Sequence, residues 1–122
     1  MEDLSILARI RAARLQPRTS LSMRNAPVYI KAYDKRVTIY FYDELLLNYR
    51  YVAVSSLDNT VYLEFSNVQS SGFYSISKRE NSGQTLIGGS NKKVLEKYVG
   101  SYNYVVVAQK KTTSLIIKLK RN

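Results

Sequence analysis

The residue types that can do chemistry in this sequence are nearly all basic. Nineteen lysines and arginines stand against nine aspartates and glutamates, which gives a formal net charge of +10 at pH 7. Histidine and cysteine are both absent, which removes the commonest general base, the usual zinc ligands and every thiol nucleophile. The remaining chemistry is electrostatic, because lysine and arginine neutralise phosphates or meet an acidic protein surface.

The carboxylates that could carry acid–base catalysis have simpler structural explanations. Asp43 and Glu44 precede a short apolar run and suit a helix cap, Asp58 falls in a turn, and Glu64 lies on the polar side of a predicted strand. Gly88 and Gly89 precede a predicted helix without the lysine spacing of a phosphate-binding loop. We therefore expect a protein with no catalytic residues, no metal and no cofactor.

The basic residues are unevenly distributed along the chain. Residues 1–24 have a net charge of +3, residues 25–66 of −1, and residues 67–122 of +8. Such asymmetry creates a one-sided positive field that attracts polyanions, although a high net charge also simply keeps proteins dispersed. The residues expected to contact phosphate are Arg36, Lys78, Arg79, Lys92, Lys93, Lys97, Lys110, Lys111, Lys118 and Lys120.

Aromatic residues add a second possible contribution to binding. Eleven tyrosines and three phenylalanines occur in the chain, many of them in predicted strands. Exposed aromatic rings on a sheet can stack unpaired bases, whereas tyrosine is also an ordinary half-buried strand residue. The sequence leaves both interpretations open.

Two segments are expected to position these residues, within one globular domain of 122 residues. Residues 1–27 are expected to form an amphipathic helix over about 3–15, ended by Pro17, and then a linker to Pro27. The residues of this helix that could contact a partner or a second copy of the chain are Leu7, Ile10, Arg11 and Arg14. The amino terminus lacks the features of a secretory signal, and no apolar run is long enough to span a membrane, so we expect a cytoplasmic protein.

Residues 28–122 are expected to form one β-rich domain with an internal repeat. Alternating apolar and polar residues predict strands over 28–33 and 37–41, a helix over 44–48, and a hairpin over 51–65. A similar order follows, with short strands over 73–77 and 85–87, a helix over 91–99 and a hairpin over 102–119, whose predicted core residues include Val105 and Val107. The predicted fold is therefore α+β: a small β-rich barrel of two strand-helix-hairpin repeats, about 28–66 and 73–120, preceded by the amphipathic helix.

The stretch RVTIYFYDELLLNYRYVAVSSLDNTVYLEF resembles the swapped-hairpin domain of the AbrB, MazE and SpoVT transition-state regulators. That family builds its barrel from two such units, and QTLIGGSNKKVLEKYVGSYNYVVVAQKKTTSLIIKLK would be the second unit on the same chain. The resemblance implies a DNA-binding regulator or an antitoxin-like protein. The family's Gly-Arg before the first strand is Lys35-Arg36 here, so the resemblance assigns a phosphate contact to Arg36.

Two classes of function remain at this point. The first is a non-catalytic, regulatory nucleic-acid-binding protein that prefers duplex DNA. The alternative is a protein-binding inhibitor or adaptor, of phage or antitoxin type, that docks on an acidic partner surface. The near-neutral stretch 25–66 favours the second class, because a uniform DNA-binding pseudo-dimer should carry bases on both halves.

Overall fold

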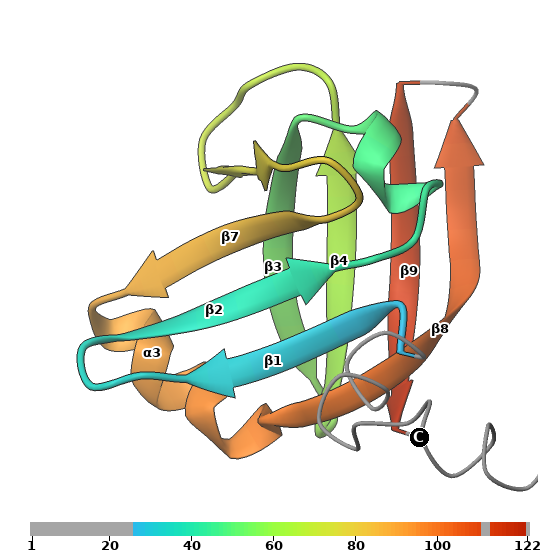
Figure 1. Cartoon of the computed structure of the whole chain (residues 1–122). Coiled ribbons are helices and arrows are strands. Elements are labelled where there is room, and N and C mark those ends of the chain that lie inside the picture. Colours follow the sequence, from blue (N-terminus) through green and yellow to red (C-terminus); the bar gives the residue numbers. More distant parts are fainter. Residues whose placement is uncertain (1–25, 111–112, 122) are drawn as a thin grey trace, which may run out of the picture.

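Nine antiparallel strands form one sheet that curls into a nearly closed barrel (Figure 1). The computed structural model describes residues 26–110 and 113–121. Neighbours in the sheet follow the order β5-β3-β4-β9-β8-β1-β2-β7-β6. The strands are β1 (Val28–Ala32), β2 (Arg36–Phe41), β3 (Tyr51–Leu57), β4 (Thr60–Ser66), β5 (Tyr74–Ser75), β6 (Ser77–Lys78), β7 (Gly83–Gly88), β8 (Gly100–Lys110) and β9 (Ser114–Arg121).

Three hairpins supply most of the barrel wall: β1–β2, β3–β4 and β8–β9. The β3–β4 turn consists of Asp58 and Asn59, whose φ angles of 53° and 61° are typical of the tight turns that match strand twist. Between the hairpins, β2 pairs with β7 and β4 pairs with β9. Together with the β1–β8 and β3–β5 pairs, these ladders join the first and second halves of the chain at four places.

The two edge strands of the sheet, β5 and β6, follow each other directly in the chain. This short connection brings the two edges together and closes the barrel. β5 pairs with β3 and β6 pairs with β7, while Ile76 between them donates its N–H to the carbonyl of Arg50 at 2.9 Å. The Thr85 hydroxyl on β7 donates to the carbonyl of Ser75 at 2.9 Å. The segment 74–78 therefore bridges β3 and β7, which would otherwise present unpaired edges.

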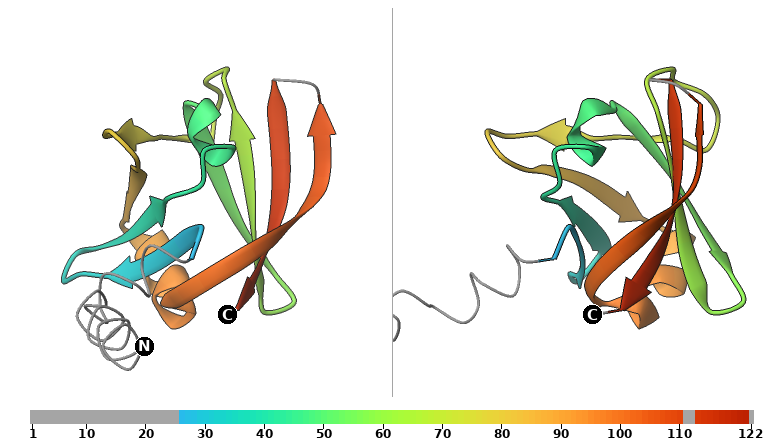
Figure 2. Two further views of the ribbon diagram at one scale, coloured as in Figure 1. Left: turned by 45° about the vertical axis from the view of Figure 1, so that its right-hand side comes forward. Right: turned by 90° about the vertical axis from the view of Figure 1, so that its right-hand side faces the viewer.

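The core consists of the inward rows of the strands, closed at each end by a short helical segment. Phe41 and Phe65 meet edge to face near its middle, with ring centroids 5.4 Å apart. The 3₁₀ helix η1 (Leu46–Asn48) inserts Leu46 at one end. At the other end, α3 (Ser90–Leu95) and the 3₁₀ helix η2 (Glu96–Tyr98) insert Leu95 and Tyr98. Figure 2 shows α3 and the end of β9 at this same end of the barrel.

The predicted α+β class is wrong. The described residues form a strand-rich barrel in which α3 is the only α-helix and spans six residues. The helix expected over 44–48 is the three-residue η1, and the one expected over 91–99 is α3 followed by η2. Capping signals mark where helices begin, but the barrel leaves room for only one or two turns.

The N-terminal amphipathic helix and almost all of its linker lie outside the described residues. The same holds for the residues expected to contact a partner there, which are Leu7, Ile10, Arg11 and Arg14. The described chain begins with Ala26, whose side chain is fully buried.

The expected core row of β8 is also wrong. Val105 and Val107 are 40% and 54% exposed, whereas Tyr102 and Tyr104 point toward the core. β8 pairs with β1 only over Gly100–Tyr102, so its later residues extend past the end of β1, and a bulge after Val106 shifts the register. Alternation alone predicts two equivalent faces and does not determine which one is covered.

Two buried threonines provide a matched test of barrel closure. Thr85 and Thr38 are each 1% exposed, but the Thr38 hydroxyl has no hydrogen-bond partner among the described residues. We expect Thr85→Val to lower the free energy of unfolding by about 1–3 kcal/mol, because the Ser75 carbonyl loses its donor. Thr38→Val should cause no loss in urea unfolding. Equal losses for both variants would contradict the role of this hydrogen bond in closure.

Candidate nucleic-acid interface

The helix-covered end of the barrel is held by buried contacts that leave its lysines outside. The Tyr98 hydroxyl lies 2.7 Å from the Ser56 hydroxyl, and the Tyr102 hydroxyl donates to the carbonyl of Tyr98. Leu95 is 4% exposed, whereas Lys93 and Lys97 on the opposite side are exposed. Because α3 and η2 are anchored in this way, their cations have fixed positions at the end of the barrel.

Basic residues from four separate segments gather at this end. Arg36 pairs with Gly88, two residues before α3, and the Arg121 guanidinium lies 3.4 Å from the carbonyl of Val99. The acidic residues there are Asp34, Asp58 and Glu96, of which Glu96 pairs with Lys92 at 3.2 Å. We call this region the basic end and define it by its segments: the β1–β2 turn and its flanks, α3 with η2, and the end of β9. Its cations are Lys31, Lys35, Arg36, Lys92, Lys93, Lys97, Lys120 and Arg121.

The other expected phosphate contacts do not join this region. Lys78 and Arg79 lie on β6 and the turn after it, and Lys110 lies at the β8–β9 turn, both at the opposite end of the barrel (Figure 1). Lys118 lies half-way along the outer surface of β9, paired with Tyr62 and Val105, and Lys111 is outside the described residues. The residues expected to contact phosphate therefore do not form one continuous surface.

The end of the barrel away from α3 also carries negative charge. A hollow of about 480 Å³ is lined by Glu44 and Glu80 together with Tyr42, Leu47, Asn48 and Asn81. Asp43 lies close by, where it accepts the Leu45 N–H at 2.9 Å and the Tyr104 hydroxyl at 2.9 Å. The far end therefore carries similar numbers of cations and carboxylates, whereas cations outnumber carboxylates at the basic end.

A cluster of tyrosines lies on the outer surface of β1 and β2, and we call it the tyrosine face. Tyr29 is paired with Tyr40, and the hydroxyl of Tyr40 lies 2.7 Å from that of Tyr33. The rings of Tyr40 and Tyr42 are nearly parallel, with an angle of 15° and centroids 6.4 Å apart. All four side chains are half-buried, so part of each remains open to a ligand.

Two cations of the basic end pack against the tyrosine face. The ammonium of Lys31 and the guanidinium of Arg36 lie 5.2 Å and 5.1 Å from the ring centroid of Tyr33. Such cation–ring contacts hold flexible basic side chains in position. The basic end and the tyrosine face are therefore one continuous surface that shares Lys31 and Arg36.

Hydrogen bonding within the tyrosine face changes how its phenols titrate. The hydrogen bond with Tyr40, together with nearby Lys31 and Arg36, lowers the pKa of Tyr33 below its usual value. Burial and the hydrogen bond with Tyr33 raise the pKa of Tyr40 to about 12, and burial also raises the pKa of Tyr42. These directions indicate that Tyr33 ionises first and that Tyr40 then donates to its phenolate, so the ionised pair has a defined polarity, whereas either hydroxyl can donate in the neutral pair.

Thr38 lies at the centre of the same surface. Its neighbours across the sheet are Lys31 on β1 and Leu86 on β7, both of which are exposed. Thr38 is nevertheless 1% exposed, and its hydroxyl has no partner among the described residues. A buried hydroxyl without a partner is costly, which makes this atom the one unsatisfied group of the tyrosine face.

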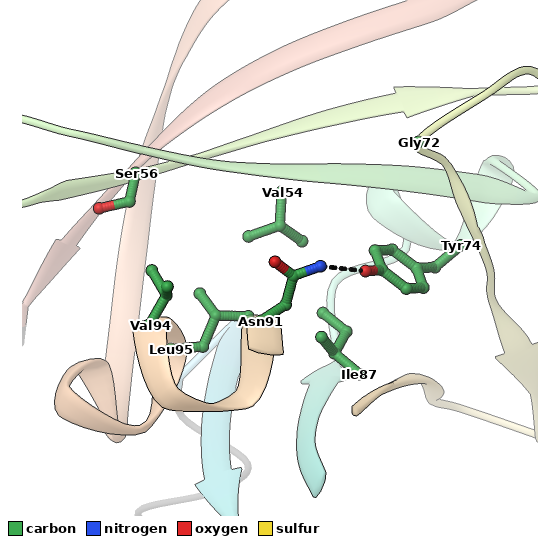
Figure 3. A pocket seen from close by; sticks show the side chains of 8 residues that line it. All are labelled: Val54, Ser56, Gly72, Tyr74, Ile87, Asn91, Val94 and Leu95. Atoms are coloured by element: carbon green, nitrogen blue, oxygen red, sulfur yellow. Dashed lines mark hydrogen bonds between the residues drawn. The ribbon is translucent and has the colours of Figure 1, made fainter. Parts of the chain in front are cut away.

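A separate pocket lies where β3 and β7 diverge below the closing segment (Figure 3). Its volume is about 280 Å³, slightly below the usual range for drug-sized ligands. Asn91 of α3 donates its side-chain amide to the Tyr74 hydroxyl at 2.8 Å, which links α3 to the closing segment. Val54, Ile87 and Leu95 supply the apolar lining. The pocket is therefore a packing gap between β3 and β7 that α3 partly covers, and we assign it no ligand.

Two further features concern other classes of site. Among residues 26–110 and 113–121, no group of three or more acidic, histidine or cysteine side chains converges to hold a metal ion. Within the same ranges, no helix has the length and apolar character needed to cross a membrane.

Comparison with known proteins finds no matching family model, no matching curated protein and no matching solved structure. The resemblance to the AbrB, MazE and SpoVT regulators therefore stays a prediction.

Sequence reasoning placed part of this surface correctly and missed the rest. Alternation predicted strands over 28–33 and 37–41, and the burial and register of β1 and β2 place Tyr29, Thr38 and Tyr40 on the row opposite the core row. It did not assign binding roles to Lys31, Lys35 or Arg121, and it did not consider Tyr42. The spacing of Tyr40 and Tyr42, two residues apart, was the available signal.

The polarity of the tyrosine pair can be tested by titration. In Tyr40→Phe, Tyr33 loses its donor, so the pKa of Tyr33 should rise toward its ordinary value. The signal that titrates at about pH 12 in the wild type should disappear from this cluster. Tyrosine ring resonances followed by NMR through alkaline pH measure both effects. An unchanged Tyr33 midpoint would contradict the assigned polarity.

Proposed function

We propose that this protein is a non-catalytic, regulatory nucleic-acid-binding protein whose basic end contacts phosphates, with duplex DNA as the favoured ligand. The observation that carries the proposal is the gathering of cations from β1, β2, α3, η2 and β9 at one end of the barrel. Lysine and arginine side chains that neutralise phosphates release condensed counterions, which provides most of the sequence-independent affinity.

The distribution of charge over the barrel supports this proposal further. Glu44 and Glu80 at the far end offset cations there, so the excess of positive charge among the described residues lies at the basic end. The field of such an uneven charge distribution orients a polyanion during encounter and is weakened by salt. If the high net charge served only to keep the protein dispersed in solution, the cations would not need to lie together.

Charge reversal at the two ends separates local contact from net charge. The variant Lys93→Glu with Lys120→Glu alters the basic end, and Lys78→Glu with Lys110→Glu makes the same charge change elsewhere. All four side chains are exposed. We expect the first variant to bind a labelled duplex at least about tenfold more weakly than the second, and to reduce the slope of log affinity against log salt by about 2.

The measurement is fluorescence anisotropy across a salt series, with thermal unfolding of both variants as the folding control. Equal losses in the two variants would assign the effect to net charge alone. No binding by the wild type at low salt would reject nucleic acid as the ligand.

A second candidate function is an adaptor that binds an acidic, extended peptide along β8. Beyond Tyr102, no strand among the described residues pairs with the outer edge of β8, and Val105, Val106 and Val107 are exposed there. A free edge accepts an added strand through main-chain hydrogen bonds. Lys110 ends β8 and Lys118 lies on the neighbouring strand β9, and both would attract an acidic partner.

A synthetic peptide of alternating valine and glutamate is a suitable probe for this edge. We expect it to shift the NMR amide signals of residues 104–110 and to protect them from hydrogen exchange. Changes confined to lysine side chains would indicate charge attraction without strand addition, and would contradict the adaptor function.

A further inference from the structure

The tyrosine face is a rigid aromatic surface rather than a set of mobile side chains. β2 pairs along its whole length with β1 on one side and β7 on the other, so the backbone that carries Tyr40 is held from both sides. The hydrogen bond between Tyr33 and Tyr40 further limits ring motion. Binding of a ligand that stacks on these rings would therefore cost little side-chain conformational entropy.

The rings are positioned to offer flat apolar surface. The rings of Tyr40 and Tyr42 are nearly parallel, so a planar group that stacks on one of them lies parallel to both. Leu86 on β7 is 50% exposed and extends the apolar area next to Thr38. Every nucleic-acid base has a flat π surface, and aromatic residues on an exposed sheet bind such surfaces whatever the base.

The unpartnered hydroxyl of Thr38 is an independent observation that points to a ligand. This hydroxyl is buried in the middle of the surface, and neither its donor nor its acceptor capacity is used by a hydrogen bond within the described chain. Base edges carry both donors and acceptors. A base that slides between the neighbouring side chains would satisfy the hydroxyl.

The charges around the tyrosine face favour an anionic polymer whose phosphates lie along one edge of the face. Lys31 and Arg36, held against Tyr33, lie at the edge that meets the basic end. Glu44 and Glu80 lie with Tyr42 at the other edge and would repel phosphates. A strand would therefore place its backbone toward Lys31 and Arg36 and leave the surface near Tyr42.

We propose that the tyrosine face binds single-stranded nucleic acid. Unpaired bases would stack on Tyr29, Tyr40 and Tyr42, the Thr38 hydroxyl would bond to a base edge, and Lys31 and Arg36 would contact the adjoining phosphates. This inference rests on the proposed function and goes beyond it, because it adds single strand at the tyrosine face to duplex at the basic end. Bases in a duplex are stacked on one another and cannot offer their faces to these rings, so duplex would use only the basic end.

The test compares two probes, a labelled oligothymidylate of about 16 nucleotides and a mixed-sequence duplex, on the full chain. Tyr40→Leu with Tyr42→Leu removes two rings and should weaken oligothymidylate binding by at least about tenfold while duplex binding changes by less than about twofold. Tyr40→Phe with Tyr42→Phe keeps the rings and should retain most single-strand affinity. Tyr62→Leu, a half-buried tyrosine on the outer surface of β4, is the matched control and should change neither.

Thr38→Val adds a variant that tests the surface without removing a ring. It should weaken oligothymidylate binding about threefold to tenfold, because a buried base edge would lose its partner, and should leave thermal unfolding unchanged or improved.

The outcomes separate the inference from the function on which it rests. Unchanged oligothymidylate affinity in the Tyr40→Leu, Tyr42→Leu variant would overturn the single-strand inference even where duplex binding persists. Loss of thermal stability without any change in binding would assign the tyrosine face to packing, and would overturn the inference as well. Failure of the wild type to bind either probe would reject the proposed function too.

Discussion

Closure of the sheet is the constraint on which the rest of this structure depends. A sheet of nine strands has two edges, and the segment 74–78 satisfies both by pairing first with β3 and then with β7. The approach is close: a Cβ on Gly83 would lie 2.8 Å from the Leu47 Cδ2 and 3.0 Å from the Ile76 Cγ2. Glycine therefore allows β7 to meet the closing segment, and closure sets which side of each strand faces the core.

Closure also determines where charge gathers. The closing segment pairs with only two residues of β3 and two of β7, so these strands diverge below it, and α3 packs at that opening. α3 and η2 insert Leu95 and Tyr98, and their lysines are left at the barrel end beside the β1–β2 turn and the end of β9. A packing requirement of the core thereby assembles a basic surface from segments far apart in the sequence.

The tyrosine face and the basic end differ in the kind of binding they offer, yet they share residues. Arg36 begins β2 next to α3 and also packs on the ring of Tyr33. Phosphate attraction is long-range and indifferent to base identity, whereas ring stacking requires contact and unpaired bases. Two such surfaces joined at one arginine allow electrostatic attraction to bring a strand to the rings. The opposite end, lined by Glu44 and Glu80, sets the limit of that surface.

The sequence by itself determined the main strands and the tight turn at Asp58, because alternation and turn chemistry are local properties. It did not determine the class of the fold, because helix length depends on the space that the barrel leaves. It predicted Val105 and Val107 as core, because a bulge and the short pairing with β1 are visible only in the folded sheet. Nor did it determine which lysines lie together. Strand order decides that, and strand order follows from long-range pairing that no local pattern records.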